Sequence, residues 1–403
     1  MRHWLIISIV FFIISCSNRQ NHDFQTLQEK LSHITDPGDR QALTDRFLQK
    51  LSKKDYPIFE NDSTVILLYK GNAEKVEMIG DLNYWTNATP LTNIKNTDLH
   101  YLRLKIPPNS VPEYWFIIND HKTQIDSLNQ YKIKNEFGYA SQIVSHNNPF
   151  YLDKIEKKEE RMTRAYLVPI DNHKYVKIHV YFPPQYNDYD YYPLAIFLDG
   201  KKYIEMGEAP QIIDNLIHEG KIEEIIAVFA ELGFNENKDE LSSEYFQNIK
   251  VLLSDTILDF LNKRFSALNN TEDRLLVGKS VSGAINIFTA LENPDKFGNV
   301  YTQSGYLSAD NFFLKQFIDE NYNTGINFYF QIGRYERNVS HMIIPPDETD
   351  FYAINHDFVK LMKEKGFKVK IQDYAAGHTW GNWKKNLSDG LIYFFGKKAD
   401  KPG

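Results

Sequence analysis

The chain has 403 residues, of which 42% are hydrophobic and 14% aromatic, so it is long enough to fill more than one core. Its formal net charge of −7 provides no basic surface that would track a phosphate backbone, which excludes nucleic acid as an expected partner. The apolar content also argues against a disordered chain.

The first residues predict a bacterial lipoprotein signal. A short positive start, Met1-Arg2-His3, precedes an apolar run over residues 4–14 that is too short to span a bilayer comfortably. The run ends in Ile14-Ser15-Cys16, which resembles the lipobox, in which the cysteine thiol receives a diacylglycerol and becomes the mature N-terminus. We therefore expect a lipid anchor at Cys16 and a periplasmic or cell-surface location in the bacterial envelope.

Cys16 is the only cysteine, so no disulfide is expected in this fold. The alternative for residues 1–16 is an ordinary secretory signal with an incidental cysteine. Residues 17–58 then predict a polar tether followed by two helices, which are separated by the breaker Asp36-Pro37-Gly38. Apolar residues recur at helical spacing on both sides of that breaker, at Phe24, Leu27, Leu31 and Ile34 and then at Leu43, Phe47 and Leu51.

Residues 59–150 predict a β-sandwich, because short apolar runs alternate with turn signals. The expected strands include residues 65–69, 76–80, 101–104 and 114–118. This part resembles the immunoglobulin-like early-set domain that precedes some hydrolases and glucan-active enzymes. The matching pieces are Gly80-Asp81 with Trp85, Tyr114-Trp115-Phe116 and Asp126-Ser127-Leu128-Asn129. Its aromatic residues are expected in the core, and it carries no catalytic constellation.

Residues 151–403 predict an α/β domain, because strand-like runs alternate with helical patterns. One long apolar stripe over residues 249–261 predicts a core-facing helix. Such a domain has a mostly parallel, doubly wound sheet and binds ligands at the carboxyl ends of its strands. The expected strands are residues 176–182, 194–198, 225–229, 275–277, 300–303, 328–331 and 369–372.

The pentad Gly278-Lys279-Ser280-Val281-Ser282, followed by Gly283, predicts a nucleophile elbow between a strand and a helix. Such a turn exposes a serine hydroxyl above the edge of a sheet and aims helical N–H groups at the reaction centre. Ser280 is therefore the candidate nucleophile. The strict pattern has glycine in the fifth position, where this chain has Ser282. An ordinary Gly/Ser turn is the alternative.

A serine nucleophile needs a base, and the base needs an orienting acid. His378 follows the last expected strand and is the candidate base. His356 falls in a helical pattern, and the placement of His341 stays open. Glu336, after the strand at 328–331, is the candidate acid, and Asp347 and Asp350 are its alternatives.

Ester hydrolysis also needs donors for the oxyanion. We expect one from the backbone N–H of Val281, the residue after the nucleophile. The second is expected from Gly200 or Lys201, because Leu198-Asp199-Gly200 ends an earlier strand. For Asp199-Gly200 an ordinary turn is the alternative.

In combination, these motifs resemble the enterochelin-esterase-like branch of the α/β-hydrolases, which is related to esterase D and to feruloyl and acetyl carbohydrate esterases. The resemblance covers roughly residues 36–391, including the early-set domain. The shared motifs are Tyr181-Phe182-Pro183-Pro184-Gln185-Tyr186, Leu198-Asp199-Gly200, the elbow, Asn293-Pro294-Asp295-Lys296-Phe297-Gly298, Gln303-Ser304-Gly305 and Gly377-His378 with Trp380 and Trp383.

This resemblance implies a serine carboxylic-ester hydrolase that acts through an acyl-enzyme on siderophore esters of the enterochelin type, with neither a metal nor an organic cofactor. Feruloyl or acetyl carbohydrate esters are the alternative substrates. Trp380 and Trp383 are expected to wall an aryl pocket or to pack in the core, and Lys238 and Arg334 to attract an anionic substrate. A non-catalytic siderophore- or glycan-binding lipoprotein, or a partner-binding module built on the early-set domain, remain alternatives of another class.

Overall fold

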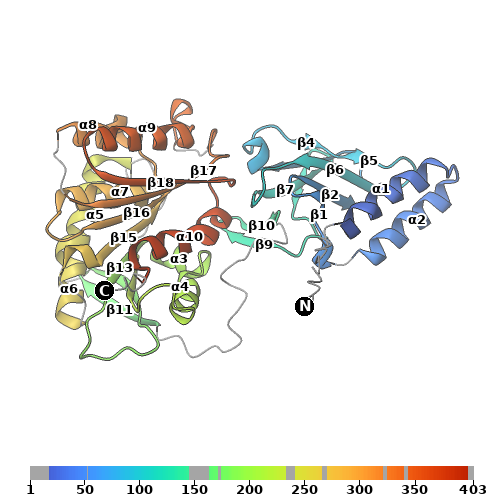
Figure 1. Cartoon of the computed structure of the whole chain (residues 1–403). Coiled ribbons are helices and arrows are strands. Elements are labelled where there is room, and N and C mark those ends of the chain that lie inside the picture. Colours follow the sequence, from blue (N-terminus) through green and yellow to red (C-terminus); the bar gives the residue numbers. More distant parts are fainter. Residues whose placement is uncertain are drawn as a thin grey trace, which may run out of the picture.

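The computed structural model describes residues 18–51, 53–144, 163–170, 174–232, 241–265, 270–320, 325–339 and 344–397. Cys16, Lys238 and His341 lie outside these ranges. An N-terminal β-rich part and a C-terminal α/β part lie next to each other, and helix α10 and strands β9 and β10 lie where they meet (Figure 1). Among the described residues, no helix has the length and apolar character that a membrane span requires.

Both helices expected near the N-terminus are present, as α1 (Asn18–Ser32) and α2 (Pro37–Lys50). Asp36 begins the second helix, because its Oδ1 accepts the N–H of Asp39 at 2.9 Å. The apolar face of α1 packs against the first β-sheet, where Phe24, Leu27 and Leu31 are almost fully buried.

The N-terminal part is a sandwich of two antiparallel sheets. The first has the order β1-β2-β6-β5 and the second β4-β3-β7-β10-β9, with β8 paired to β7. Side chains such as Leu67 and Phe116 fill the space between the sheets. The strands are β1 (Ile58–Asn61), β2 (Thr64–Lys70), β3 (Val76–Gly80), β4 (Thr89–Pro90), β5 (Thr92–Asn93), β6 (Leu99–Lys105), β7 (Glu113–Ile118), β8 (Lys122–Gln124), β9 (Lys132–Asn135) and β10 (Gly138–Gln142).

The C-terminal part is built on a sheet of eight strands in the order β11-β12-β14-β13-β15-β16-β17-β18. From β14 to β18 the neighbouring strands run parallel, whereas β11 and β12 are antiparallel. The expected strands are all found, and the edge strand β11 is one that the sequence did not predict. The bounds are β11 (Thr163–Pro169), β12 (Tyr175–Tyr181), β13 (Leu194–Leu198), β14 (Ile226–Glu231), β15 (Arg274–Lys279), β16 (Asn299–Gln303), β17 (Asn327–Gly333) and β18 (Lys368–Tyr374).

Helices cover both faces of this sheet, as a doubly wound α/β fold requires. Along β13, Ile196 and Leu198 enter one core, and Ala195 and Phe197 enter the other. The first core also holds α5 (Ser243–Val251), α6 (Leu258–Arg264), α7 (Ser280–Glu292), α8 (Ala309–Glu320) and α9 (Phe351–Glu364). The second holds α3 (Gly200–Glu205), α4 (Ala209–His218) and α10 (Trp380–Phe395).

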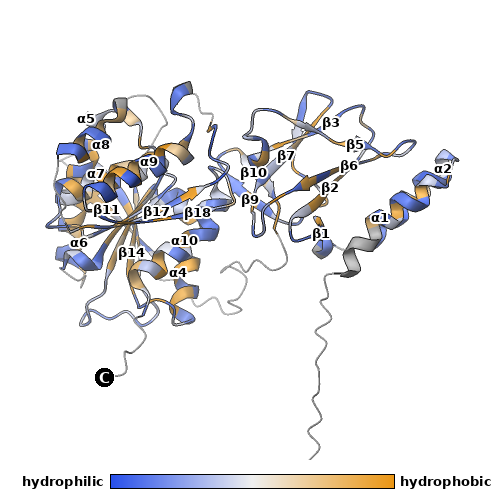
Figure 2. Ribbon diagram, turned by 45° about the horizontal axis from the view of Figure 1, so that its top comes forward, coloured by the Kyte–Doolittle hydropathy of each residue, from blue (hydrophilic) through white to orange (hydrophobic). Residues whose placement is uncertain are grey.

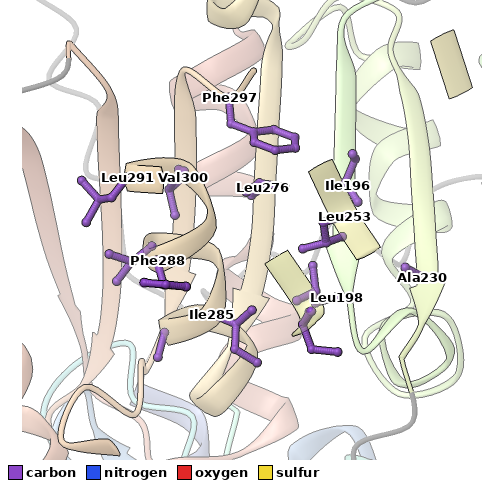
Figure 3. Packing of buried hydrophobic residues seen from close by; sticks show 14 of the residues in the cluster. Ile196, Leu198, Ala230, Leu253, Leu276, Ile285, Phe288, Leu291, Phe297 and Val300 are labelled. Carbon is purple, nitrogen blue, oxygen red and sulfur yellow. The ribbon is translucent and has the colours of Figure 1, made fainter. Parts of the chain in front are cut away.

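Packing in the first core fixes α7 against the sheet. Ile285, Phe288 and Leu291 of α7 lie near Leu276 and Val300 of the strands (Figure 3). Each such side chain contributes about 1.5–3 kcal/mol when it leaves water. The central strands β13 and β14 are apolar along almost their whole length, and helices such as α8 and α9 carry polar as well as apolar residues (Figure 2). The start of α7 is therefore held firmly at the end of β15.

The apolar stripe over residues 249–261 is helical throughout, but not as one regular α-helix. A π-helical stretch, Leu252–Ile257, lies between α5 and α6. Ile249, Leu253 and Leu261 are buried on one face despite the wider turn. Hydrophobic spacing predicted the buried face but not the change of helix type.

Candidate active site

Ser280 occupies a strained turn between β15 and α7. Its φ is 48°, in the left-handed region that residues with a Cβ seldom adopt. Ser282 has no such φ and lies inside α7, so the family's glycine is not needed there. Its hydroxyl accepts the N–H of Lys279 at 3.0 Å and donates to the carbonyl of the same residue at 2.7 Å. The second serine therefore holds the turn that presents the first.

The structure brings Ser280, His378 and Glu336 together in one hydrogen-bonded chain. His378 Nε2 lies 3.2 Å from Ser280 Oγ, and His378 Nδ1 lies 2.7 Å from Glu336 Oε2. A carboxylate beside Nδ1 leaves Nε2 unprotonated and able to accept the serine proton. The edges of Phe351 and Trp383 meet the imidazole at centroid distances of 4.8 and 4.9 Å and fix its plane.

Glu336 is fully buried, and three donors that bind its Oε1 fix the orientation of the carboxylate. Its Oε1 accepts the Gly333 N–H at 2.8 Å, the Ser304 hydroxyl at 2.7 Å and the Asn382 amide at 3.3 Å. The indole of Trp383 in turn donates to Ser304 Oγ at 2.9 Å. These bonds leave Oε2 for the histidine.

The other candidate acids and bases lie elsewhere. Asp350 begins α9, where it accepts the Ala353 N–H at 2.9 Å. Asp347 belongs to the short 3₁₀ helix Pro346–Glu348. His356 lies on α9 and pairs with Asp373 at 3.0 Å.

The residues expected to donate to an oxyanion lie at two helix starts. Val281 is in the first turn of α7 and lines the cavity beside Ser280. Gly200 begins α3, and a Cβ there would lie 2.2 Å from the backbone carbon of Phe229, so only glycine fits. Lys201 follows it with an exposed side chain. N–H groups in the first turn of a helix have no partner within that helix, so they are free to bind an anion.

A cavity of about 360 Å³ opens above Ser280 and His378 between the two parts of the chain. Aromatic rings of both parts form its walls. The sandwich contributes Tyr84, Trp85, Trp115 and Phe137, and the α/β domain contributes Tyr306, Tyr335, Trp380 and Trp383. Trp380 and Trp383 are only 1% and 4% exposed, so they wall the cavity and pack in the core at once.

Carboxyls outnumber lysines among the described residues that line the cavity, and both lysines have a carboxylate partner. Lys279 lies 3.5 Å from Asp199 and over the rings of Trp380 and Trp383, at 5.2 and 4.8 Å from their centroids. Lys202 lies 3.5 Å from Glu136. Two further carboxyls on the wall, Asp81 and Glu113, are each 1% exposed, and burial raises their pKa values to about 7 and about 8.

The expected cationic rim is not part of this wall. The side chain of Arg334 is exposed and does not line the cavity, so its role in attracting an anionic substrate stays a prediction. Its backbone N–H donates to the carbonyl of Tyr374 at 2.8 Å, next to the pairing of β17 with β18. Lys238 lies outside the described residues.

Sequence reasoning missed the aromatic residues that the sandwich contributes. It assigned them to the core, yet Phe137 is 82% exposed and Tyr84 37%. The alternation along β7 contains the signal for Trp115, because Tyr114 and Phe116 point inward and so Trp115 must point outward. Trp115 packs edge-on against Trp85, with centroids 5.0 Å apart.

Comparison with known proteins agrees with this architecture. The family described as "Putative esterase" matches residues 172–394. An uncharacterized protein of Bacillus subtilis, YjcH, is 22% identical over 215 residues, which are 53% of this chain and 88% of that protein.

Two crystal structures of enterobactin esterases share the fold over both parts. The enzyme of Shigella flexneri, determined in the presence of 2,3-dihydroxy-N-benzoyl-serine, has a TM-score of 0.64 at 16% identity, covering 83% of this chain and 94% of its own. The ferric enterobactin esterase of Salmonella typhimurium has a TM-score of 0.67 at 13% identity, covering 82% and 93%. Residues 172–394, which match the esterase family, include Ser280, Glu336 and His378 and the hydrogen bonds that link them. The protein therefore belongs to the esterase family of α/β-hydrolases and is a carboxylic ester hydrolase.

Proposed function

We propose that Ser280 is the nucleophile of a two-step ester hydrolysis. Its Oγ attacks the ester carbonyl while His378 Nε2 takes the hydroxyl proton and then gives it to the leaving alcohol. Water, deprotonated by the same nitrogen, attacks the acyl-enzyme and releases the acid. Glu336 holds the imidazole and stabilises its charged form. The proposal rests on the distances of 3.2 and 2.7 Å that link the three side chains.

Backbone donors complete the proposed mechanism. The negative oxygen of the tetrahedral intermediate would be bound by the N–H of Val281 and by that of Gly200 or Lys201, at the starts of α7 and α3. The dipoles of both helix starts favour negative charge at that point.

A fluorophosphonate probe and p-nitrophenyl acetate test the nucleophile. The wild-type protein should be labelled and should hydrolyse the ester, and Ser280→Ala should lose both. Ser282→Ala is the matched control: it keeps the label at a lower rate, because the turn loses two hydrogen bonds. A label that persists in Ser280→Ala, or a wild-type protein without label or turnover, would favour the non-catalytic binding alternative.

For the substrate, we propose an ester whose acyl part carries a phenolic ring, with a catecholate siderophore of the enterochelin type as the first candidate. Rings from both parts of the chain surround Ser280, and each stacked ring contributes on the order of 1 kcal/mol. The fold shared with the enterobactin esterases extends over both parts that form the cavity. This favours a substrate large enough to touch both.

The charges on the cavity wall favour a neutral substrate over an anionic one, because carboxyls outnumber lysines there. Lys279 and Lys202 already have carboxylate partners, so they attract an anion weakly. We therefore propose that the iron-free siderophore is hydrolysed in preference to its ferric complex. A feruloyl glycan ester is the second candidate, because it is neutral and brings an aromatic ring.

A screen of kcat/KM separates these substrates. The iron-free trilactone, its ferric complex, a feruloylated oligosaccharide and p-nitrophenyl acetate are compared at low and high salt. Preference for an anionic complex would appear as a loss of kcat/KM with added salt, because exposed charges are screened within about 8–10 Å. Faster turnover of simple acetyl esters than of every aromatic ester would refute the aromatic substrate and leave the esterase activity.

We also propose that Cys16 is lipidated, which would attach the enzyme to a membrane of the cell envelope. The support is the sequence of residues 1–16, which lies outside the described structure. Metabolic labelling with an alkyne fatty acid should mark the wild-type chain and not Cys16→Ala. A Cys16→Ala chain that still carries lipid would refute this.

A further inference from the structure

The loop that carries His378 is bonded to the sandwich on both sides of the histidine. This histidine loop, residues 375–379, connects β18 to α10. Before His378, the N–H of Val111 donates to the carbonyl of Ala375 at 3.1 Å. After it, the N–H of Gly381 donates to Glu113 Oε1 at 2.7 Å. Both partners belong to the sandwich.

Glu113 acts as the cap of α10. That helix has no capping bond from its own preceding residue, Thr379. The first N–H groups of a helix need an acceptor, and a carboxylate is favoured at the positive end of the helix dipole. Here Glu113 provides that acceptor from another domain. The start of α10, two residues after His378, is therefore fixed from the sandwich.

Asp81 of the sandwich also lies directly against the histidine loop, beside Gly377. A Cβ on Gly377 would lie only 2.1 Å from Asp81 Oδ1, so glycine is required beside this carboxylate. Within its own domain Asp81 is fixed by the Trp85 indole and by the Glu113 N–H, each at 2.8 Å. The backbone N–H of Gly377 also favours its charged form.

Burying Asp81 and Glu113 close together costs free energy, which other interactions of these two carboxyls must offset. Each is 1% exposed, and they lie close enough to repel each other and, for Asp81, Glu336. Burying carboxyls in this way is unfavourable unless N–H donors satisfy them. Here the donors are backbone groups on either side of His378 together with groups of the sandwich. A role in fixing the loop accounts for the arrangement.

We propose that Asp81 and Glu113 are positioning residues, through which the N-terminal sandwich holds His378 within reach of Ser280 and Glu336. The inference rests on the proposed function, because its consequence for rate assumes that His378 is the base. It makes the sandwich a part of the catalytic apparatus as well as a wall of the cavity. A shift of the imidazole by about 1 Å is expected to slow the reaction on the order of 100-fold.

Asp81→Asn and Glu113→Gln test the proposal in the full chain, because both variants keep the side-chain volume and exchange one acceptor for a donor. The matched control is Asp126→Asn. Asp126 is also 1% exposed in the sandwich, but it accepts the hydroxyls of Tyr56 and Tyr114 at 2.6 and 2.7 Å and does not touch the histidine loop.

Three measurements are compared: kcat and KM for p-nitrophenyl acetate, the rate of Ser280 labelling by a fluorophosphonate, and deuterium uptake of residues 375–382. In Asp81→Asn and Glu113→Gln we expect kcat and the labelling rate to fall about 10- to 100-fold. KM of this small ester should change less than about twofold, because it binds without the sandwich rings. Deuterium uptake of the histidine loop should be faster.

Asp126→Asn should lower the Tm of the protein, yet leave kcat and loop protection close to wild type. Unchanged kcat and uptake in both loop variants would overturn the proposal, and so would an equal loss of kcat in Asp126→Asn. If one loop variant does not fold, the other carries the test. If the wild type neither turns over nor reacts with the probe, the proposed function fails, and deuterium uptake still decides whether the two carboxyls hold the loop.

Discussion

The two parts of the chain contribute to the same cavity in different ways. The α/β domain supplies Ser280, His378 and Glu336, which are linked by hydrogen bonds, and three donors fix Glu336. The sandwich supplies rings with much freer surfaces, of which Phe137 is 82% exposed. The comparison shows that the hydrogen-bonded reacting groups belong to the α/β domain, whereas the exposed part of the aromatic wall belongs to the sandwich.

The largest effect should come from the α/β side. Glu336→Gln keeps the shape of the side chain but presents an amide to His378 Nδ1, which disturbs the tautomer that the serine needs. We expect kcat to fall about 10³- to 10⁴-fold with little change in KM. Steady-state hydrolysis of p-nitrophenyl acetate measures this.

Asp350→Asn is the control for Glu336→Gln, since Asp350 was an alternative acid and lies at the start of α9. It should change stability little, because asparagine keeps the oxygen that caps α9, and it should not lower kcat. If Asp350→Asn abolished turnover and Glu336→Gln did not, the assignment of the acid would be reversed.

An intermediate effect should come from the sandwich side. Trp115→Ala removes an aromatic surface from the cavity wall and should reduce kcat/KM for a catechol or feruloyl ester about five- to tenfold, mostly through KM. Hydrolysis of p-nitrophenyl acetate should change little, because the small acyl group does not reach this ring.

Tyr189→Ala provides the matched control for Trp115→Ala. Tyr189 is 92% exposed and does not line the cavity, so losing it should change neither substrate. If Trp115→Ala slowed acetyl and aromatic esters equally, the division of labour between the two domains would be wrong.

The contrast between the two domains also explains what the sequence predicted. The elbow at Ser280 and the loop with His378 are local patterns, and the order of strands places both at one edge of the sheet. Glu336 followed from the same rule, and the structure places it against the histidine. All three could be named because each depends mainly on its own neighbours in the chain.

Contacts between the domains could not be predicted in this way. Nothing near Glu113 in the sequence indicates that it caps α10, since the two partners are 268 positions apart. The aromatic residues of the sandwich were assigned to its core because rings are usually buried, and only the alternation along β7 argues otherwise. Arg334 was expected to attract an anionic substrate, and its exposed side chain does not line the cavity, so that role stays a prediction. Side-chain direction at a rim depends on packing that no local pattern specifies.

The smallest expected effect is on the pH dependence of stability, and it tests the buried carboxyls Asp81 and Glu113 at the boundary between the domains. Burial raises the pKa of Asp81 from 3.8 to about 7 and that of Glu113 from 4.5 to about 8, and the charge of Asp81 adds to the increase for Glu113. The charged groups that face them are Glu336 for Asp81 and Glu136 for Glu113. Between pH 4.5 and 7 the folded protein therefore holds protons that the unfolded chain has released.

The free energy of unfolding must then fall as pH rises through this window, because the unfolded state binds fewer protons. Tm is measured from pH 5.5 to 7.5 for the wild type and for the double variant Asp81→Asn/Glu113→Gln, and the two curves are subtracted. Subtraction removes groups common to both, such as His100, whose pKa burial lowers and whose slope is opposite. Between pH 5.5 and 7.5, the Tm of the double variant should fall by a few degrees less than the Tm of the wild type. Parallel curves would mean that both carboxyls are already charged in the folded protein, held by the N–H groups of Trp85, Glu113 and Gly381.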